Sequence, residues 1–320
     1  MPFIAFNEFN QEVTASQCHD EYISNGTIFE KFRCAFCEVR YHSRNIYKDA
    51  LLGKAPHFYL AKGVRHIGLC DGEPIVAVSP AAANEPIKTV TKREFDFPAK
   101  LTPRPKPRLI GVLPGEGTVP PDEQEIRKRR VRAGKEHGVS CFTTSLLQNI
   151  VESKNKLISW CYEEAKRKKL AVGARNQLIK ETAESYPLQL FDQKDLTYNS
   201  AFGRADYAWR DGSTRIFHAK KGTVTLTDGG FVIRSEPEVQ AAAIEGAAPR
   251  RTSEVHYHPP SSDLIGEIPR SHVRLLEELK SAAEAGTALQ WYVYGGLEFM
   301  NEINVISLAN LDHLFFRKER

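Results

Sequence analysis

Two short pairs of metal-binding residue types near the amino end constrain this chain more than any other feature. Cys34 and Cys37 form a C-x2-C pair, and His66 and Cys70 form an H-x3-C pair separated from it by 28 residues. Tetrahedral zinc prefers thiolate and imidazole ligands, and two close pairs joined by a loop bring four of them together with little strain. The spacing therefore predicts a zinc ion that orders a small amino-terminal module.

The same residues leave two other interpretations open. His57, in Pro56-His57-Phe58, competes with His66 as the third ligand, or else orients a ligand from outside the coordination shell. A lone C-x2-C is also typical of redox-active cysteines, although a redox pair needs no downstream histidine and cysteine. We expect a cytoplasmic protein, because the first ten residues do not form an export signal, and a structural disulfide is disfavoured in a reducing compartment.

Positive charge is concentrated in the middle of the chain. The chain has 44 basic and 40 acidic residues, so its net charge is +4. By segment, the net charge is −2 over residues 1–85, +9 over 86–185 and −3 over 186–320. A basic segment attracts phosphates, because neutralising them releases condensed counterions. The candidate nucleic-acid contacts are Arg127, Lys128, Arg129, Arg130, Arg132, Lys166, Arg167, Lys168 and Lys169.

A proline-rich segment separates the amino-terminal part from the rest. Seven prolines lie between Pro98 and Pro121, a density that helix interiors and central strands do not tolerate. The sequence therefore predicts an α+β protein with four parts: a zinc module over residues 1–90, a Pro-rich basic linker over 91–138, a helical segment over 139–190, and a β-rich domain with one inserted helix over 191–320.

Apolar periodicity predicts three helices after the linker. Apolar residues recur at three- and four-residue spacing from Leu146 to Ala165, with Thr143 or Thr144 as the expected N-cap and Lys154 on the polar face. Shorter helices are expected over 174–185 and 272–285.

The remaining segments alternate between strand and turn signals. Strands are expected over 204–209, 214–218, 223–227, 231–233, 289–294 and 303–308, and a long loop over 236–263. A small curved sheet resembling an oligonucleotide-binding barrel is one arrangement that these strands favour. No run of about 18 apolar residues is present, so no membrane-spanning segment is predicted.

The cysteine-containing region resembles a known family. Phe32-Arg33-Cys34-Ala35-Phe36-Cys37, Pro56-His57-Phe58 and the stretch from His66 to Cys70 are similar to the amino-terminal zinc-finger region of competence CoiA-like proteins and related bacterial proteins of mobile elements and phage-defence loci. The resemblance implies a bacterial, cytoplasmic protein that handles DNA or acts beside a protein that does. We therefore expect a nucleic-acid partner, with DNA favoured over RNA, or a protein partner of a competence or antiviral defence system. It covers about residues 1–75, and Tyr59-Leu60-Ala61-Lys62 stands where a second histidine usually follows.

Members of that family often carry a nuclease-like region, so carboxylates that could hold Mg²⁺ matter here. Asp206 precedes His218-Ala219-Lys220 by twelve residues, but His218 stands where a second carboxylate is needed. We expect this spacing to be coincidental or the relic of an inactive site. No phosphate-binding glycine loop and no nucleophile motif is present either, so no catalytic residue is assigned.

Aromatic residues are frequent in the β-rich part, and Tyr207, Trp209 and Phe217 are the candidates for stacking on unpaired bases. Together these features predict a non-catalytic, zinc-containing, nucleic-acid-binding protein. The alternatives are a metal-dependent nuclease with a degenerate or unrecognised site, and a partner-regulated toxin-like effector or protein-interaction module.

Overall fold

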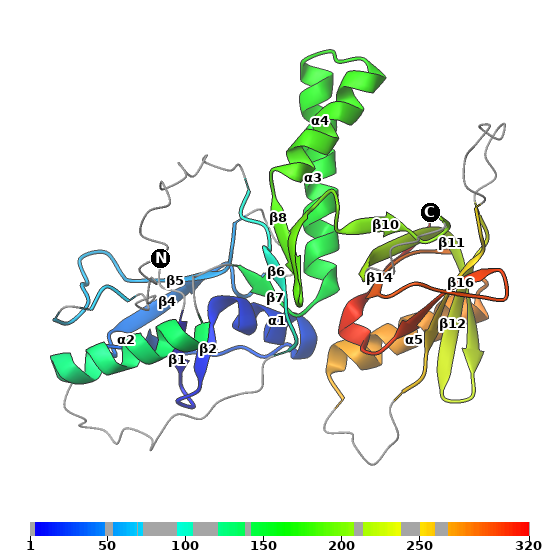
Figure 1. The fold of residues 1–320 in the computed structure, drawn as a ribbon. Helices are drawn as coiled ribbons and strands as arrows, with labels where there is room; N and C mark the ends of the chain where they lie inside the picture. The colour runs from blue at the N-terminus through cyan, green and yellow to red at the C-terminus, as the bar shows by residue number, and fades with distance from the viewer. Residues whose placement is uncertain are drawn as a thin grey trace. The chain divides into compact units, whose positions relative to one another are not determined.

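The computed structural model describes residues 4–48, 54–68, 70–72, 95–104, 121–137, 142–207, 214–237, 250–259 and 268–319. The chain divides into two compact units, residues 1–145 and residues 146–320. Both units contain helices and strands, which confirms the predicted α+β class (Figure 1). None of the described helices has both the length and the apolar character that crossing a lipid bilayer requires.

The first unit is built on an antiparallel sheet with the strand order β2-β1-β3-β4-β5. Its core contains the fully or almost fully buried side chains of Ile4, Phe32, Tyr41 and Phe58. The strands are β1 (Ile4–Asn7), β2 (Glu12–Thr14), β3 (Phe32–Cys34), β4 (Arg40–Arg44) and β5 (His57–Tyr59).

Helix α1 (Ala15–Asn25) follows β2 directly. Thr14 caps it, because its hydroxyl accepts from the Gln17 amide at 3.1 Å while the Gln17 side chain accepts from the Thr14 amide at 2.6 Å. Gly26 ends the helix in the left-handed conformation, with φ of 68°.

Helix α1 is also joined to strand β7 (Thr143–Thr144), which pairs in parallel with β6 (Lys100–Leu101). The buried carboxylate of Asp20 accepts from the Thr144 hydroxyl at 3.0 Å, and from the amide and hydroxyl of Ser145 at 2.7 and 2.9 Å. Thr144 therefore binds α1 rather than capping the next helix, contrary to the prediction.

Helix α2 (Glu123–His137) lies in the segment that the sequence assigned to the linker. It begins after Asp122, whose carboxylate accepts from the Glu125 amide at 2.7 Å, as an N-cap does. Ile126 and Ala133 are buried in the core of the first unit. The basic part of residues 91–138 is thus a packed helix and not an extended spacer.

The second unit opens with two helices, α3 (Leu147–Arg167) and α4 (Val172–Glu184), which confirm the predicted helices. Leu147, Ile150, Leu157 and Cys161 are fully buried along one side of α3. A hairpin of β8 (Pro187–Leu190) and β9 (Gln193–Thr197) follows α4.

An eight-stranded mixed sheet forms the rest of the second unit, in the order β15-β16-β13-β12-β11-β14-β17, with β10 also pairing with β11. The pairs β10/β11 and β13/β16 are parallel, and this order differs from the oligonucleotide-binding-like barrel considered from the sequence. Helix α5 (Arg270–Glu284) confirms the predicted inserted helix, and its Leu279 joins Phe217 and Trp291 in the core. The strands are β10 (Phe202–Arg204), β11 (Arg215–Thr227), β12 (Gly230–Ser235), β13 (Ser253–Tyr257), β14 (Leu289–Gly295), β15 (Glu298–Met300), β16 (Ile303–Leu308) and β17 (Leu314–Lys318).

Strand β11 joins the two segments that the sequence predicted as separate strands. Its pairing with β14 shifts register between Ala219 and Gly222, and Lys221 has a φ of 54°. A Cβ at Gly222 would lie 2.6 Å from the Trp291 ring, so glycine lets the bent strand approach that side chain. Strand β13 was also missed, because it lies in the predicted loop over 236–263.

Candidate metal centre

Four side chains of the first unit come together as the sequence spacing predicts. The ligand atoms of Cys34, Cys37, His66 and Cys70 all lie within 4.8 Å of one another and could hold a metal ion. The Cys34 and Cys70 sulfurs are 3.7 Å apart, and Nδ1 of His66 lies 3.3 Å from the Cys37 sulfur and 3.7 Å from the Cys70 sulfur. The three cysteines are buried and His66 is partly buried, so the chain encloses the site.

The first ligand pair lies in the turn between β3 and β4. The Glu38 amide donates to the Cys34 carbonyl at 2.9 Å, and the Cys34 amide donates to the Val39 carbonyl at 2.8 Å. Glu38 adopts a φ of 65°, which turns the chain sharply after Cys37. The Phe36 amide points at the Cys34 sulfur at 3.5 Å, an arrangement that favours a thiolate.

The second ligand pair repeats this arrangement in a turn of its own. The Cys70 amide donates to the Ile67 carbonyl at 3.3 Å, and the Gly72 amide points at the Cys70 sulfur at 3.3 Å. Gly72 has a φ of 75°, and a Cβ there would lie 2.7 Å from both the His66 ring and the Tyr41 hydroxyl. Only glycine fits this position without displacing a ligand.

Tyr41 of β4 forms one wall of the site. Its ring meets the His66 ring edge-on at 5.7 Å and stacks on Phe58 at 6.0 Å. The Tyr41 hydroxyl is buried without a hydrogen-bond partner among the described residues. Burial, followed by the nearby charge of Cys34, raises the pKa of Tyr41 far above its ordinary value, so the hydroxyl stays protonated beside the sulfur. Neither Tyr41 nor Gly72 was singled out from the sequence.

In the absence of a metal ion, Cys37 is the thiol of the cluster whose pKa is lowered, so it is the one that most readily forms a thiolate. Hydrogen bonds from Cys34 and then Cys70 lower the pKa of Cys37, against the opposing effect of its burial. Hydrogen bonds with Cys34 and Cys37, followed by burial, raise the pKa of the Cys70 thiol. A cation placed among the three sulfurs would favour their deprotonated forms, which are the forms that bind metal.

His57 lies outside this cluster, so the structure selects His66 as the histidine of the set. His57 is in β5, opposite Arg44, and its Nδ1 lies 3.0 Å from the Ala55 carbonyl. It does not belong to the group of ligand atoms that approach one another in the described part of the chain.

The basic helix α2 is attached to both halves of the metal centre. Arg129 donates to Glu38 at 3.0 Å, and Arg130 donates to Asp71 at 2.7 Å. Glu38 directly follows Cys37 and Asp71 directly follows Cys70. Arg132 lies 3.4 Å from Glu12. Three of the predicted nucleic-acid contacts therefore form ion pairs within the first unit.

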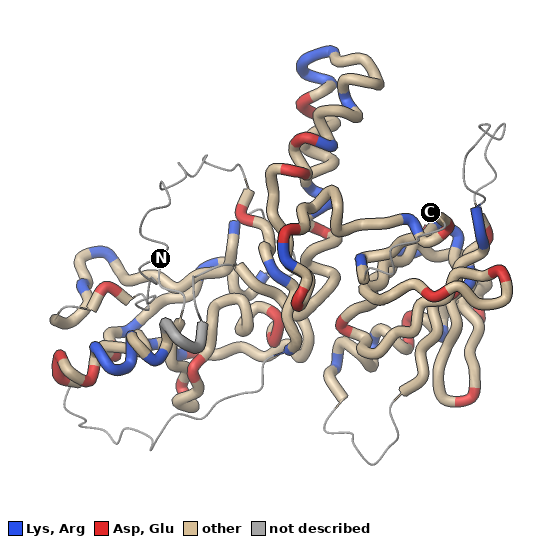
Figure 2. The backbone as a smooth tube through the Cα atoms, in the orientation of Figure 1, with Lys and Arg blue, Asp and Glu red and all other residues tan. Residues whose placement is uncertain are grey.

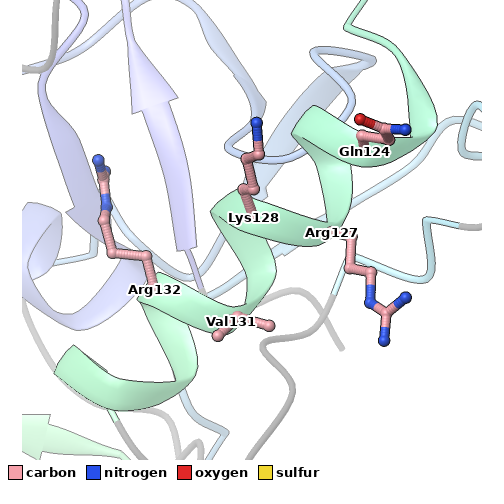
Figure 3. Close-up of a pocket in the computed structure, with 5 residues that line it drawn as sticks. All are labelled: Gln124, Arg127, Lys128, Val131 and Arg132. Atoms are coloured by element: carbon pink, nitrogen blue, oxygen red, sulfur yellow. The ribbon is translucent and has the colours of Figure 1, made fainter.

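Arg127, Lys128 and Arg132 of α2 are exposed. Figure 3 shows Arg127 and Lys128 with Gln124, Val131 and Arg132 around a surface pocket of about 550 Å³. Arg127 and Lys128 are one residue apart and both exposed, while Ile126 beside them is buried. The sequence identified the basic cluster but not this division into inward and outward residues.

The second basic cluster lies where α3 ends, and Figure 2 shows it at the turn that joins α3 to α4. Lys166, Arg167, Lys168 and Lys169 are all exposed. Glu164 forms ion pairs with Arg167 and Lys168.

The residues considered for catalysis are placed differently from a metal-dependent nuclease site. Both Asp206 oxygens accept from Arg204, at 3.0 and 2.8 Å, and one also accepts from Arg250 at 3.1 Å. The carboxylate that would hold Mg²⁺ is thus already bound by two guanidinium groups. No metal-binding group other than the Cys/His cluster occurs among the described residues.

Of the three aromatic residues proposed to stack on bases, Phe217 was assigned wrongly, because it is fully buried in the core of the sheet. Tyr207 is 37% exposed, and the Arg250 guanidinium lies 5.0 Å from its ring centre. Trp209 lies outside the described residues.

Comparisons of the chain with protein-family models, with curated proteins and with solved structures give no match. The resemblance to competence CoiA-like proteins therefore stays a prediction, and the geometry of the site carries the functional argument.

Proposed function

We propose that this chain is a zinc-containing protein that binds nucleic acid, preferably DNA, without cleaving it. Three thiolates and one imidazole are a ligand set typical of structural zinc. With zinc–sulfur bonds of about 2.3 Å and zinc–nitrogen bonds of about 2.0 Å at tetrahedral angles, two sulfurs lie about 3.8 Å apart and a sulfur and a nitrogen about 3.5 Å apart. The observed separations of 3.7, 3.3 and 3.7 Å fit these values.

The zinc would have a structural role. Four protein ligands complete a tetrahedral ion and leave no position for a reactive water. Such an ion would fix the turns that carry Glu38 and Asp71, and these two carboxylates hold α2. Metal binding would therefore contribute to the folding free energy of the module and of the basic helix together.

The observation that supports the proposal most strongly is that some basic residues of α2 are paired within the first unit while others are exposed to solvent. Arg129 and Arg130 form ion pairs with Glu38 and Asp71, while Arg127 and Lys128 are exposed on the same helix. An exposed pair of cations on a fixed element is suited to contact phosphates, because little side-chain and backbone freedom is lost on binding. The Lys166–Lys169 cluster would supply further sequence-independent affinity.

The zinc part is tested by elemental analysis of the purified full chain. We expect one zinc per chain, retained when Cys18→Ser is introduced and lost in Cys37→Ser. Cys18 is a matched control, because it is a buried cysteine of the same unit that lies outside the ligand group. A different metal, an empty protein, or equal retention in the two variants would contradict this part.

The nucleic-acid part is tested by fluorescence anisotropy with labelled double-stranded DNA, single-stranded DNA and RNA. We expect affinity for DNA to fall at least tenfold between about 50 and about 200 mM salt, because phosphate contacts release counterions. The double variant Arg127→Ala/Lys128→Ala should weaken binding and reduce the salt slope by about one for each lost contact.

The control for that experiment is Lys194→Ala/Lys280→Ala, which removes two exposed charges elsewhere. Equal losses in the two double variants, or binding that does not respond to salt, would overturn the assignment to α2. A stoichiometric protein partner that copurifies after nuclease treatment would favour a protein-interaction role instead.

A further inference from the structure

Lys154 lies on the buried side of α3, not on the polar face that the sequence predicts for it. It follows Ile150 by four residues and precedes Leu157 by three, and both of these side chains are fully buried. The Lys154 ammonium lies 3.6 Å from the centre of the Phe202 ring on β10. A position whose spacing calls for an apolar residue is therefore occupied by a cation.

No counter-charge balances this cation within the described part of the chain. The Lys154 ammonium forms no ion pair or hydrogen bond there, and its contact with Phe202 is a cation–π interaction. Burial alone lowers the pKa of Lys154 to about 7. Burying an ammonium without a partner costs free energy, and proteins retain such costs mainly where a site needs them.

His218 of β11 is near enough to Lys154 for the two groups to interact electrostatically. The strand register places Arg204, His218 and Tyr292 next to one another on β10, β11 and β14. Burial, followed by the positive charges of Lys154, Arg204 and Lys220 and opposed by the charge of Asp206, lowers the pKa of His218 to about 4. The ring is therefore neutral at pH 7 and has one N–H to donate.

The His218 ring also lacks a hydrogen-bond partner in the described residues. The ring lies tilted against the Tyr292 ring, with the two ring centres 5.5 Å apart. A partly buried imidazole and a partly buried ammonium thus lie close together, and each has donors that no described group accepts.

The acidic groups nearby are already engaged. Asp206 accepts from Arg204 and Arg250, as described above. Glu152, the acidic residue closest to Lys154 along α3, accepts from Gln148 at 3.1 Å. These contacts leave the Lys154 ammonium without an acidic partner among the described residues, and a bound anion would neutralise it.

We propose that Lys154 and His218 form an anion site that takes a phosphoryl group, with Lys220 and Arg204 adding positive potential beside it. A terminal phosphate carries a charge of about −1.5 to −2 near pH 7 and offers three acceptor oxygens, enough for the ammonium and the imidazole N–H at once. Two sources share this chemistry, a terminal phosphate of a nucleic acid and a free nucleotide. The first rests on the proposed function and the second does not.

The test is phosphate binding by the full chain, measured by thermal unfolding and by ³¹P NMR. Inorganic phosphate is compared with potassium chloride at equal ionic strength, so that screening does not contribute to the difference. We expect phosphate to raise the unfolding temperature of the wild-type protein. Without phosphate, Lys154→Met should unfold at a higher temperature than the wild type, because a buried charge is removed. Added phosphate should not raise the unfolding temperature of this variant further.

His218→Gln should also weaken phosphate binding, by about tenfold, because one charge-assisted hydrogen bond is lost. Lys180→Met on α4 removes an exposed lysine and should behave like the wild type. If Lys154→Met does not fold, Lys154→Gln replaces it. Its phosphate binding is then compared with that of the wild type by the ³¹P line width alone, and weaker binding is expected. Equal phosphate responses in the wild type and in the Lys154 and His218 variants would overturn the proposal.

The source of the phosphoryl group is found by comparing 5′-phosphorylated with 5′-hydroxyl oligonucleotides, and both with adenosine monophosphate. Preference for the phosphorylated oligonucleotide that depends on Lys154 supports a strand end, and nucleotide binding alone supports a free nucleotide. The outcome is separate from that of the proposed function, because salt-dependent binding through Arg127 and Lys128 persists in the Lys154 variants if only this site fails.

Discussion

Arg129 of α2 donates to Glu38 at 3.0 Å, and Glu38 is the residue that directly follows the candidate metal ligand Cys37. Arg33 of β3 also pairs with Glu38, at 3.5 Å, so one carboxylate joins the sheet, the ligand turn and the helix. The second attachment, between Arg130 and Asp71, lies next to Cys70. Helix α2, which carries the exposed cations, therefore forms an ion pair next to each of the two ligand pairs.

Removing the metal should loosen α2 together with the ligand turns. We expect the amides of residues 34–44, 66–72 and 123–133 to exchange hydrogen faster after treatment with a strong chelator, because the ion no longer fixes the two carboxylates. Hydrogen-exchange mass spectrometry of the full chain measures this, with α5 as the internal reference. Faster exchange in the turns while α2 stays protected would show that the helix docks without the ion.

Arg129→Met should destabilise the first unit by about 1 kcal/mol, because it leaves a partly buried Glu38 with one fewer donor. Urea unfolding followed by circular dichroism measures the change. Arg127→Met, on the exposed face of the same helix, is the matched control and should change stability by less than about 0.5 kcal/mol. In DNA binding the order of the two effects should be reversed. Arg127→Met should weaken the affinity for DNA more than Arg129→Met does, because Arg127 is the exposed residue proposed to contact phosphates.

The metal ligands were predictable because their chemistry is local in sequence. Each pair, Cys34 with Cys37 and His66 with Cys70, is held by a single turn, so spacing alone indicated the set. The choice between His57 and His66 required the fold, since β5 carries His57 away from the cysteines and pairs it with β4. Gly72 carried a weak signal, as a glycine two residues after a ligand.

Helix α2 was missed because proline density dominated the interpretation of residues 91–138. Pro121 precedes the N-cap Asp122 and so lies outside the helix, where it removes no helical hydrogen bond. The signals for a helix start were present beside the signals for a linker. Inward and outward arginines could not be separated, because their partners Glu12, Glu38 and Asp71 are distant in sequence.

Lys154 shows a different limit of sequence patterns. The apolar periodicity predicted the bounds of α3 within two residues. It placed Lys154 on the solvent-exposed face, because lysine side chains are usually exposed. Its position over Phe202 depends on how β10 pairs with β11, a parallel contact that no local signal encodes. Such a departure from pattern marks a functional candidate only after the fold is known.

Gly72→Ala should weaken metal binding as well as folding. The new methyl group would lie 2.7 Å from the His66 ring, and φ of 75° is unfavourable for alanine. Gly63→Ala is the matched control, because Gly63 has a φ of 86° but nothing within 4 Å of the added carbon. Both variants should lose about 1 kcal/mol from backbone strain. Competition with a chromogenic chelator should show weaker metal affinity in Gly72→Ala alone, and equal affinities would mean that the ring is free to move.

Asp20 should make the first unit less stable as pH rises toward neutrality. Burial raises the pKa of this carboxyl from 3.8 to about 7, against the opposing hydrogen bonds from Ser145 and Thr144 and the charge of Arg104. Between about pH 4 and pH 7 the folded chain keeps a proton that the unfolded chain has released, so the stabilisation is complete below the ordinary pKa and is lost as pH rises to about 7.

Asp20→Asn removes this titration while keeping a side chain of the same shape. The stability of Asp20→Asn relative to the wild type should therefore increase with pH across that window, by as much as about 1.4 kcal/mol per pH unit. Hydrogen exchange of the α1 amides in both proteins at matched pH measures the difference and cancels the pH dependence of metal binding. A difference that stays constant from pH 5 to pH 8, or one that falls, would show that Asp20 is ionised in the folded chain throughout.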